Sequence, residues 1–314
     1  MLLQIPETDE ALYRIGSDAQ LEYVTPILSL VTETYDATIG IRSAINTRNL
    51  SGADPARQAR AQAARRDLAR IQMERAASGA LRWNVCQYPT HAQAQEADMS
   101  LREYEDFVYG ACRVDEPDPV ALWHERNVQQ ARLVDWLKGK ERVEVHGPHV
   151  DLRLSIAGRS FINDAGRRNM PGGEVFTSPV EDSVEGWIEF SFPAIFGGRE
   201  VENVRLVFRG GRVVEAHAAK GEEFLVRMLH TDEGAQRLGE FAVGNNYGIT
   251  RFTKNMLFDE KIGGTIHLAL GRGFPQAGSR NVSSLHWDML CDMRGGGTIT
   301  ADGVRFYDGG KFLV

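Results

Sequence analysis

Apolar and polar positions in the first 140 residues repeat mainly with the period of an α-helix. Ser17 precedes an acidic turn and an apolar run over residues 21–28, which predicts a capped amphipathic helix. Asp118 followed by Pro119 is typical of an N-cap with proline at the first helical position. The apolar stripe over residues 120–136 then predicts a long helix that ends near a Lys-Gly-Lys stop.

Residues 34–43 alternate between apolar and polar positions and could form a strand. A helix is expected almost at the start of the chain, with no strand before it on which it could pack. We therefore expect residues 1–140 to be a mainly helical α/β domain that is truncated at its start.

The pattern changes after residue 140, where short β-type runs are separated by glycine-rich turns. A helix is expected over residues 222–229. The fold class is therefore a mixture of α+β and α/β, with a β-rich catalytic domain over residues 141–314. The predicted strands cover residues 143–145, 152–156, 184–192, 204–208, 212–217 and 265–270.

Charge and composition narrow the class of partner. The chain has 314 residues, a formal net charge of -7 and a hydrophobic content of 42%. This acidic balance argues against a general polyanion binder. One basic stretch, residues 57–75, is rich in alanine, arginine and glutamine. A solvated helix face explains it better than contact with nucleic acid.

Cysteine usage and hydropathy bear on the compartment. Cys86, Cys112 and Cys291 lie far apart and form no CxxC pair, so neither a disulfide framework nor a thiolate zinc cluster is expected. No apolar run approaches about 20 residues, and no signal peptide opens the chain. We expect a soluble cytoplasmic protein that binds neither nucleic acid nor membrane.

The segment SSLHWDMLCD contains the strongest local signal for metal chemistry. In a strand, His286 and Asp288 project from one face and could reach one ion together. The alternative is a hydrogen-bonded His–Asp pair in the core. His267, in GGTIHLALG, has apolar neighbours and is by itself typical of a core histidine. Glu260 shortly before it strengthens the case for a metal ligand.

Two further glutamates interrupt apolar or glycine-rich surroundings. Glu174 stands in MPGGEVFTSP and Glu240 in RLGEFAVGNN. A carboxylate among buried neighbours needs a partner, and a metal ion is one. An ion pair with a nearby arginine, such as Arg167, Arg168 or Arg237, is the alternative for both.

Four carboxylates and two imidazoles match the co-catalytic sites of hydrolases, in which two metals lower the pKa of a bridging water. A closed structural zinc site would need four Cys/His ligands. The chain contains no GxSxG elbow, HExxH helix or Walker loop. The six candidate metal ligands are Glu174, Glu240, Glu260, His267, His286 and Asp288.

Several longer motifs resemble the M29 family of metallo-aminopeptidases, the aminopeptidase T and aminopeptidase S group. The matching stretches are INDAGRRNMPGGEVFTSPVEDSVEG, AAKGEEFL, LGEFAVGNNYGI, LFDEKIGGTIHLALG and NVSSLHWDML. The resemblance implies an N-terminal α/β domain, a β-rich catalytic domain, a homodimer and two metals. The family's ligands fall on the same six residues, with Glu240 as the bridging carboxylate.

The sequence departs from the family pattern at two places. Phe274 in GRGFP replaces a tyrosine of the family that is placed near the metals, so a hydroxyl is lost. Loss of one transition-state donor can reduce a rate by roughly 10²–10³. The family's first strand and helix also have no counterpart at the start of this chain.

We therefore interpret the chain as an aminopeptidase that removes N-terminal residues from peptides through a water activated by two metals. Glu240 or Glu260 is the candidate general base, and the metals are Zn, Co or Mn. Glu181 or Asp182 could hold the substrate amine. The alternatives are an amidase that acts on a non-peptide amide, and a catalytically impaired relative that binds peptide or metal.

Overall fold

In the computed structural model, which describes residues 5–314, contacts between residues divide the chain at Leu101/Arg102 into two units. No helix among residues 5–314 is both long enough and apolar enough to cross a membrane.

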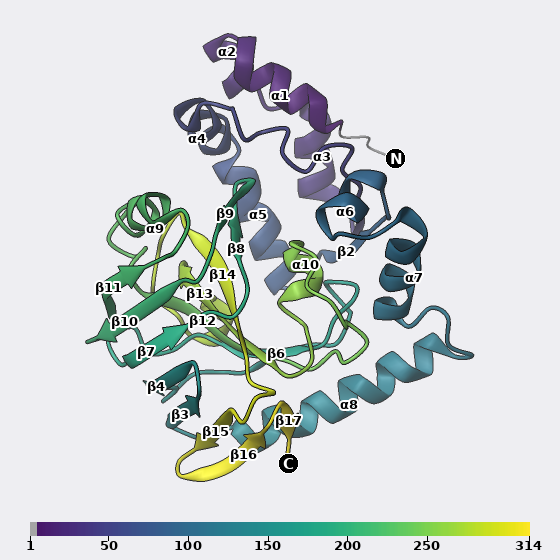
Figure 1. Cartoon of the computed structure of the whole chain (residues 1–314). Helices are drawn as coiled ribbons and strands as arrows, with labels where there is room; N and C mark the ends of the chain where they lie inside the picture. The colour runs from purple at the N-terminus through teal and green to yellow at the C-terminus, as the bar shows by residue number, and fades with distance from the viewer. Residues whose placement is uncertain (1–4) are drawn as a thin grey trace. The chain divides into compact units, whose positions relative to one another are not determined.

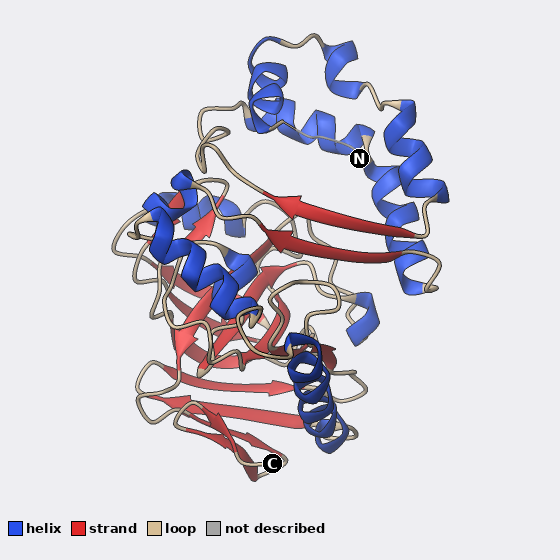
Figure 2. Ribbon diagram, turned by 90° about the vertical axis from the view of Figure 1, so that its right-hand side faces the viewer, coloured by secondary structure: helices blue, strands red, loops and turns tan. Residues whose placement is uncertain are grey.

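The first unit is built around a parallel pair of strands, β1 and β2, which lie side by side in Figure 2. Two helices connect the strands, as a parallel pair requires. The strand expected over residues 34–43 is confirmed as β1. The elements are α1 (Pro6–Ile15), α2 (Asp18–Glu22), α3 (Pro26–Thr34), β1 (Ala37–Arg42), α4 (Pro55–Ala64), α5 (Arg66–Ala77), β2 (Arg82–Gln87) and α6 (His91–Glu96).

The helix expected over residues 21–28 is two helices. Ser17 caps α2 as expected, in a capping box with Gln20. The chain then leaves the helix at Tyr23, which has extended backbone angles, and a new helix starts at Pro26. The expectation was wrong because a residue before proline is driven out of the helical region, here Thr25. The basic stretch forms the helices α4 and α5.

The second unit begins with two helices, α7 (Leu101–Cys112) and α8 (Pro119–Leu137). Asp118 caps α8 by accepting a hydrogen bond from the Ala121 N–H, and Pro119 is its first residue, as expected. Both helices thus cluster with the strand-rich region. Strands begin at Arg142, near the expected change of character at residue 140. As a domain boundary, residue 140 remains a prediction.

Antiparallel sheets dominate the second unit, and three of their strands, β12, β13 and β14, run side by side in Figure 1. An eight-stranded sheet has the order β11-β10-β7-β4-β3-β15-β16-β17, and a five-stranded sheet has the order β14-β13-β12-β6-β5. A third sheet pairs β8 with β9. All six predicted strands and the helix over residues 222–229 are confirmed.

The elements of this unit after α8 are β3 (Arg142–Gly147), β4 (Val150–Ser155), β5 (Ile162–Asp164), β6 (Glu174–Thr177), β7 (Glu185–Glu189), β8 (Ala194–Phe196), β9 (Arg199–Val201), β10 (Arg205–Arg209), β11 (Arg212–His217), α9 (Glu222–Leu229), β12 (Leu238–Gly244), α10 (Met256–Asp259), β13 (Thr265–Gly271), β14 (His286–Asp292), β15 (Thr298–Ala301), β16 (Val304–Asp308) and β17 (Lys311–Phe312), with a 3-10 turn at Pro275–Ala277.

The two larger sheets share one apolar core. Val145 and Leu152 of the eight-stranded sheet belong to the same buried cluster as Phe241, Leu268 and Trp287 of the five-stranded sheet. One face of each sheet is therefore shielded from water by the other. The opposite face of the five-stranded sheet carries polar side chains and is not part of this shared core.

Helix α8 covers the β5–β6 end of the five-stranded sheet. The buried side chain of Gln130 donates through Nε2 to the backbone oxygens of Asp164 (3.1 Å) and Glu174 (2.8 Å). The sheet edge therefore has hydrogen-bond partners on the helix, and the first residue of β6 is fixed in position.

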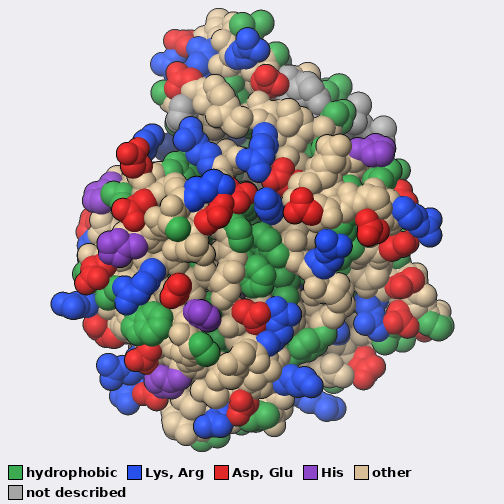
Figure 3. Space-filling view, in the orientation of Figure 1, with side chains coloured by type: hydrophobic (Ala, Val, Ile, Leu, Met, Phe, Trp, Pro, Cys, Tyr) green, Lys and Arg blue, Asp and Glu red, His purple; other side chains and the backbone are tan. Residues whose placement is uncertain are grey.

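Basic and acidic side chains are interspersed on the face of the molecule in Figure 3. This mixed surface agrees with the modest acidic net charge of -7.

Candidate metal centre

The six predicted ligands come together in the second unit, and strand register explains how. Glu240 and Asp288 are both paired with Ala269, on the strand between them, so they share its face. His267 and His286 lie two residues from Ala269 and Asp288, and therefore point to the same side. The small side chain of Ala269 leaves room between the two carboxylates.

Glu174 reaches this face from β6. Phe176, two residues further along β6, is paired with Ala242, which is paired with His267. The residue before Glu174 has to be glycine, because Gly173 has a φ of +121° and a Cβ there would lie 2.6 Å from the Cβ of Asn246.

Glu240 lies between the two imidazoles. Its Oε1 is 3.6 Å from His267 Nε2, and its Oε2 is 3.3 Å from His286 Nε2. His286 Nε2 is also 3.6 Å from Asp288 Oδ1. That separation is too long for the His–Asp hydrogen bond considered as the alternative for this pair. The ring is oriented from its other side, where Nδ1 lies 2.8 Å from the Arg272 carbonyl oxygen.

Glu174 faces His267 across the sheet, with Oε2 3.3 Å from His267 Nε2. The arginine pairing considered for Glu174 and Glu240 is not what the structure shows: their ionic partners are Lys261 and the two histidines. Three sets of donor atoms each lie within 4.8 Å of one another. The sets are Glu174–Glu240–His267, Glu240–His286–Asp288 and Glu260–His267–Asp288.

Several polar atoms at the centre of the cluster are buried without a hydrogen-bond partner among residues 5–314. They are Glu174 Oε2, Asp288 Oδ1 and both ring nitrogens of His267. An unsatisfied buried polar atom costs about 1–3 kcal/mol. Carboxylate oxygens and imidazole nitrogens together are a donor set suited to Zn, Co or Mn. The residues present therefore fit divalent metal ions.

Glu260 lies at the end of the short helix α10, whereas the other five candidate ligands lie on strands. Asn255 caps α10, and the buried Asp259 accepts hydrogen bonds from the backbone and the hydroxyl of Thr253. Glu260 follows directly and has 18% of its side chain exposed. Gly264 then turns the chain into β13 with a φ of +91°.

Lys261 is a residue of the site that sequence reasoning missed. Its side chain is fully buried and contacts Glu260, and its Nζ lies 3.4 Å from Glu174 Oε1. Little in the sequence pointed to this, because Lys261 directly follows Asp259 and Glu260 in LFDEKIGG, where a lysine is typical of a solvated charged turn.

The charges of the cluster act strongly on one another. Burial alone would raise the pKa of Glu240, but the two imidazoles that face it, His267 and His286, lower it to about 2. Burial would lower the pKa of both histidines, yet the neighbouring carboxylates raise it to about 9 for His267 and about 10 for His286. Burial raises the pKa of Asp288 to about 6 and that of Glu174 well above its usual range.

Phe274, the departure from the family pattern, lies beside this cluster. Its ring meets that of His286 edge-on at 5.3 Å and packs on Phe176 at 5.0 Å. Its backbone N–H donates to Ser178 Oγ. The position next to a candidate ligand is therefore filled by an apolar ring with no hydroxyl to donate.

The carboxylate of Glu181, which was considered for binding the substrate amine, instead makes hydrogen bonds that hold two loops together. Its carboxylate accepts hydrogen bonds from Arg159 (2.5 Å), Ser279 (3.3 Å) and the Arg280 N–H (2.7 Å). These contacts hold the loop after β13 against the loop after β6. Asp182, next to it, is exposed.

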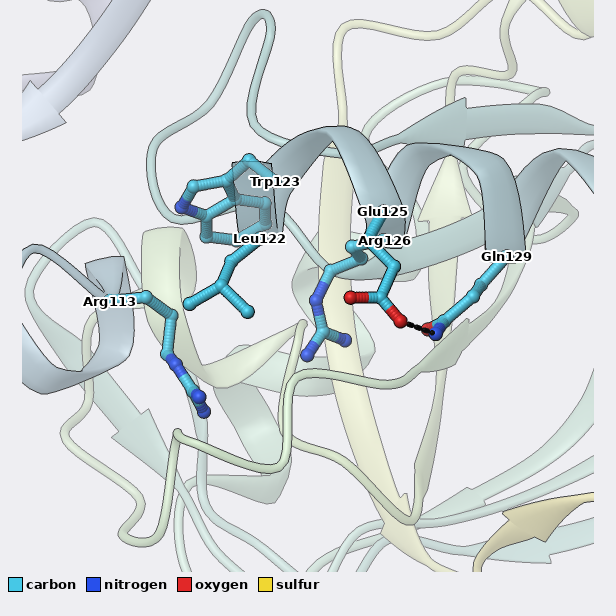
Figure 4. Close-up of a pocket in the computed structure, with 6 residues that line it drawn as sticks. All are labelled: Arg113, Leu122, Trp123, Glu125, Arg126 and Gln129. Carbon is cyan, nitrogen blue, oxygen red and sulfur yellow. Dashed lines mark hydrogen bonds between the residues drawn. The ribbon is translucent and has the colours of Figure 1, made fainter. Parts of the chain in front are cut away.

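A separate cavity of about 150 Å³ lies beside α8 and is lined by none of the six candidate ligands. Arg113 and Arg126 point toward the same space, with Leu122 and Trp123 beside them (Figure 4). Arg126 donates to the Asn245 carbonyl oxygen at 2.7 Å. It therefore braces the segment that follows β12.

Comparison with known proteins gives consistent matches. The sequence model of the thermophilic metalloprotease (M29) family matches residues 1–312. Aminopeptidase 2 of Geobacillus stearothermophilus is 34% identical over 234 residues, which are 68% of this chain and 56% of that protein. Aminopeptidase T of Thermus aquaticus is 33% identical over 250 residues, which are 72% of this chain and 60% of that protein. The chain thus spans less than two thirds of the length of these relatives.

Solved structures show a shared fold. The wild-type AmpT structure from Thermus thermophilus matches with a TM-score of 0.84 and 24% identity, over 100% of this chain and 86% of that one. A 2,5-dihydroxypyridine dioxygenase from Pseudomonas putida KT2440 matches with a TM-score of 0.52 and 16% identity, over 95% of this chain and 98% of that one. A shared fold does not fix a shared reaction.

The family model covers nearly the whole chain. This chain is a member of the thermophilic metalloprotease (M29) family.

Proposed function

We propose that this chain is an aminopeptidase that hydrolyses the N-terminal peptide bond of peptides with two divalent metal ions. The observation that carries the proposal is the convergence of six carboxylate and imidazole side chains on one buried cluster with unpartnered donor atoms. Membership in a metalloprotease family supports the requirement for divalent metal.

The six residues that would hold the ions are Glu174, Glu240, Glu260, His267, His286 and Asp288. The three donor sets overlap, since each pair of them shares one residue, and this supports more than one cation position. Glu240 suits a bridging role because its two oxygens face different imidazoles. Zn, Co and Mn all accept such mixed oxygen and nitrogen ligands.

Metal ions in such a site polarise the scissile carbonyl and lower the pKa of a shared water. The protein has to supply a proton acceptor, and we propose Glu260 over Glu240. Glu260 has 18% of its side chain exposed, whereas Glu240 has 6%, and both oxygens of Glu240 are directed at histidines. The Phe274 ring packs edge-on against His286 and places an apolar wall beside it.

A peptide substrate follows from the aminopeptidase activity itself. Cys86, Cys112 and Cys291 form no disulfide among residues 5–314, which suits the reducing cytoplasm. A homodimer follows from the family resemblance, and light scattering coupled to gel filtration would measure it.

The proposal is tested with metal-stripped protein and a panel of aminoacyl-p-nitroanilides, with Zn, Co or Mn added back. We expect metal to restore release of nitroaniline, and Glu240→Gln to abolish it. Two bound ions per chain without release from any substrate would rule out the aminopeptidase. Release from simple amides alone would favour the amidase.

A further inference from the structure

The strongest feature that the proposed function does not use is the buried lysine beside the metal cluster. Lys261 has no exposed surface. Its backbone is fixed on both sides, because its N–H donates to the Phe258 oxygen and its carbonyl accepts from the Asn246 N–H, both at 2.9 Å. The ammonium group therefore has a defined place, and its neighbours are set by the fold.

Three carboxylates surround this ammonium. Nζ contacts Glu260 Oε1, lies 3.4 Å from Glu174 Oε1 and 4.0 Å from Asp164 Oδ2. Asp164 and Glu174 are directly opposite each other on the antiparallel strands β5 and β6, and both are buried. Like charges at directly opposite positions destabilise a sheet unless a cation lies between them.

Lys261 also divides the oxygens of Glu174 between two directions. Oε1 faces the ammonium, whereas Oε2 faces His267 Nε2 at 3.3 Å and has no hydrogen-bond partner among residues 5–314. A protonated lysine donates hydrogen bonds and cannot ligate a metal. The ammonium thus leaves one oxygen of Glu174 directed at the candidate metal cluster.

The charge balance of the cluster agrees with this division. Ionised Asp164, Glu174, Glu240, Glu260 and Asp288 carry five negative charges, and the Lys261 ammonium balances one of them. Imidazoles that bind a metal ion are neutral, and in that state four negative charges remain. This is the charge that two divalent ions would neutralise.

We propose that Lys261 is a built-in cation of the cluster, whose ammonium occupies the position between Asp164, Glu174 and Glu260 that a third ion would otherwise take. It is a positioning residue, because it acts through Glu174 and Glu260 and has no surface from which to touch a substrate. The assignment of two metal ions rests on the proposed function. The neutralisation of Asp164 and Glu174 rests only on the contacts described.

The first test measures stability in chelator, without metal. Lys261→Met keeps the volume of the side chain and removes its charge, so its melting temperature should fall by at least about 5 °C. Adding Asp164→Asn to this variant removes one of the facing charges and should restore at least half of the loss. Melting of K261M at the wild-type temperature, or no recovery in the double variant, would overturn the proposal.

The second test counts bound Mn²⁺ per chain by elemental analysis after gel filtration. Lys261→Ala opens the position and should bind one more ion than the wild type, whereas Lys261→Arg should bind the same number as the wild type. Lys220→Ala is a matched control, since Lys220 also contacts two glutamates but is 59% exposed. An equal count in K261A and wild type would overturn the proposal. A wild-type count below two would instead refute the two-ion proposal, and the difference between K261A and wild type would still test Lys261.

Discussion

The two large sheets of the second unit differ in how far their residues are exposed to water. Strand β4 of the eight-stranded sheet alternates between buried and exposed residues, with Leu152 in the core and Asp151 and Arg153 in water. Strands β6, β12 and β13 of the five-stranded sheet are buried at every position. A charge on the first sheet is solvated, and a charge on the second needs a partner from the protein or from a bound ion.

The eight-stranded sheet therefore has a supporting role, whereas the five-stranded sheet carries candidate metal ligands. The five-stranded sheet uses one face for the apolar core and the other for Glu174, Glu240, His267 and Asp288, which all lie out of water. Low exposure strengthens every electrostatic interaction there. Removing a carboxylate should therefore have a large effect on the five-stranded sheet and a small effect on the eight-stranded sheet.

The largest expected effect is the loss of a carboxylate charge on the buried sheet. Glu240→Gln removes the charge that faces both His267 and His286, so kcat/KM on an aminoacyl-p-nitroanilide should fall by at least about 10²–10³. Bound metal per chain, measured by elemental analysis, should fall as well.

Glu189→Gln is the matched control for this comparison. Glu189 lies on β7 of the eight-stranded sheet, and 47% of its side chain is exposed. Its kcat/KM should remain within about twofold of the wild type, because an exposed ion pair contributes little. If E189Q lowers activity as far as E240Q does, burial is not what distinguishes the two sheets.

The second effect concerns packing on the core side of the same sheets. Leu268, next to His267, is fully buried in the shared core, so Leu268→Ala should lower the free energy of unfolding by about 2–5 kcal/mol. Val214 on β11 is 50% exposed, and Val214→Ala should lower it by less than about 1 kcal/mol. Urea titration measures both. Equal losses would show that the five-stranded sheet is no better packed than the edge of the other sheet.

The two sheets also differ in what could be predicted from the sequence. Short runs of β-type residues identified β3 and β4, which are each long enough to be recognised in the sequence. The short strands β5, β8 and β9 have only three residues each, too few to show a period. The extra break before Pro26 was visible in the sequence but was overridden by the apolar pattern around it.

Within the site, glutamates and histidines inside apolar runs could be predicted because a buried charge needs a partner. Lys261 did not meet this criterion, because it directly follows Asp259 and Glu260 in a charged stretch of the sequence. Asp164 could not be found in this way. Its proximity to Glu174 depends on the pairing of β5 with β6, which is a long-range property of the fold.

The third predicted effect is an increase in kcat. Phe274 packs against His286 on the polar side of the five-stranded sheet, where the family carries a tyrosine. Phe274→Tyr adds a hydroxyl to this wall, and a transition-state donor there should raise kcat by about tenfold with little change in KM. Phe176→Tyr, on the neighbouring ring, is the control and should not raise kcat. A decrease in kcat for F274Y would show that the hydroxyl points away from the reacting atoms or disturbs the packing.

The smallest predicted effect concerns Glu181, in the segment that connects the two sheets. Glu181 follows β6 of one sheet and precedes β7 of the other, and its carboxylate holds Arg159 and the Arg280 N–H. Burial alone would raise the pKa of Glu181, but these hydrogen bonds and the charge of Arg159 lower it below the ordinary 4.5. The folded protein therefore binds this proton less readily than the unfolded chain does.

The sign of the pH dependence follows from that order. The contribution of Glu181 is complete above pH 4.5 and is lost as the pH falls through the lowered pKa of the folded state. Glu181→Gln should reduce the free energy of unfolding by about 1 kcal/mol at pH 7, because partial exposure screens the pair. The difference from wild type should shrink as the pH is lowered from 7 to below 4.5, and Asp182→Asn, at the exposed neighbouring position, should show little difference at either pH. Urea titrations at both pH values measure the gap. A gap that stays constant would mean that Glu181 holds the link through its shape alone, and that the charge in this loop has no part in joining the two sheets.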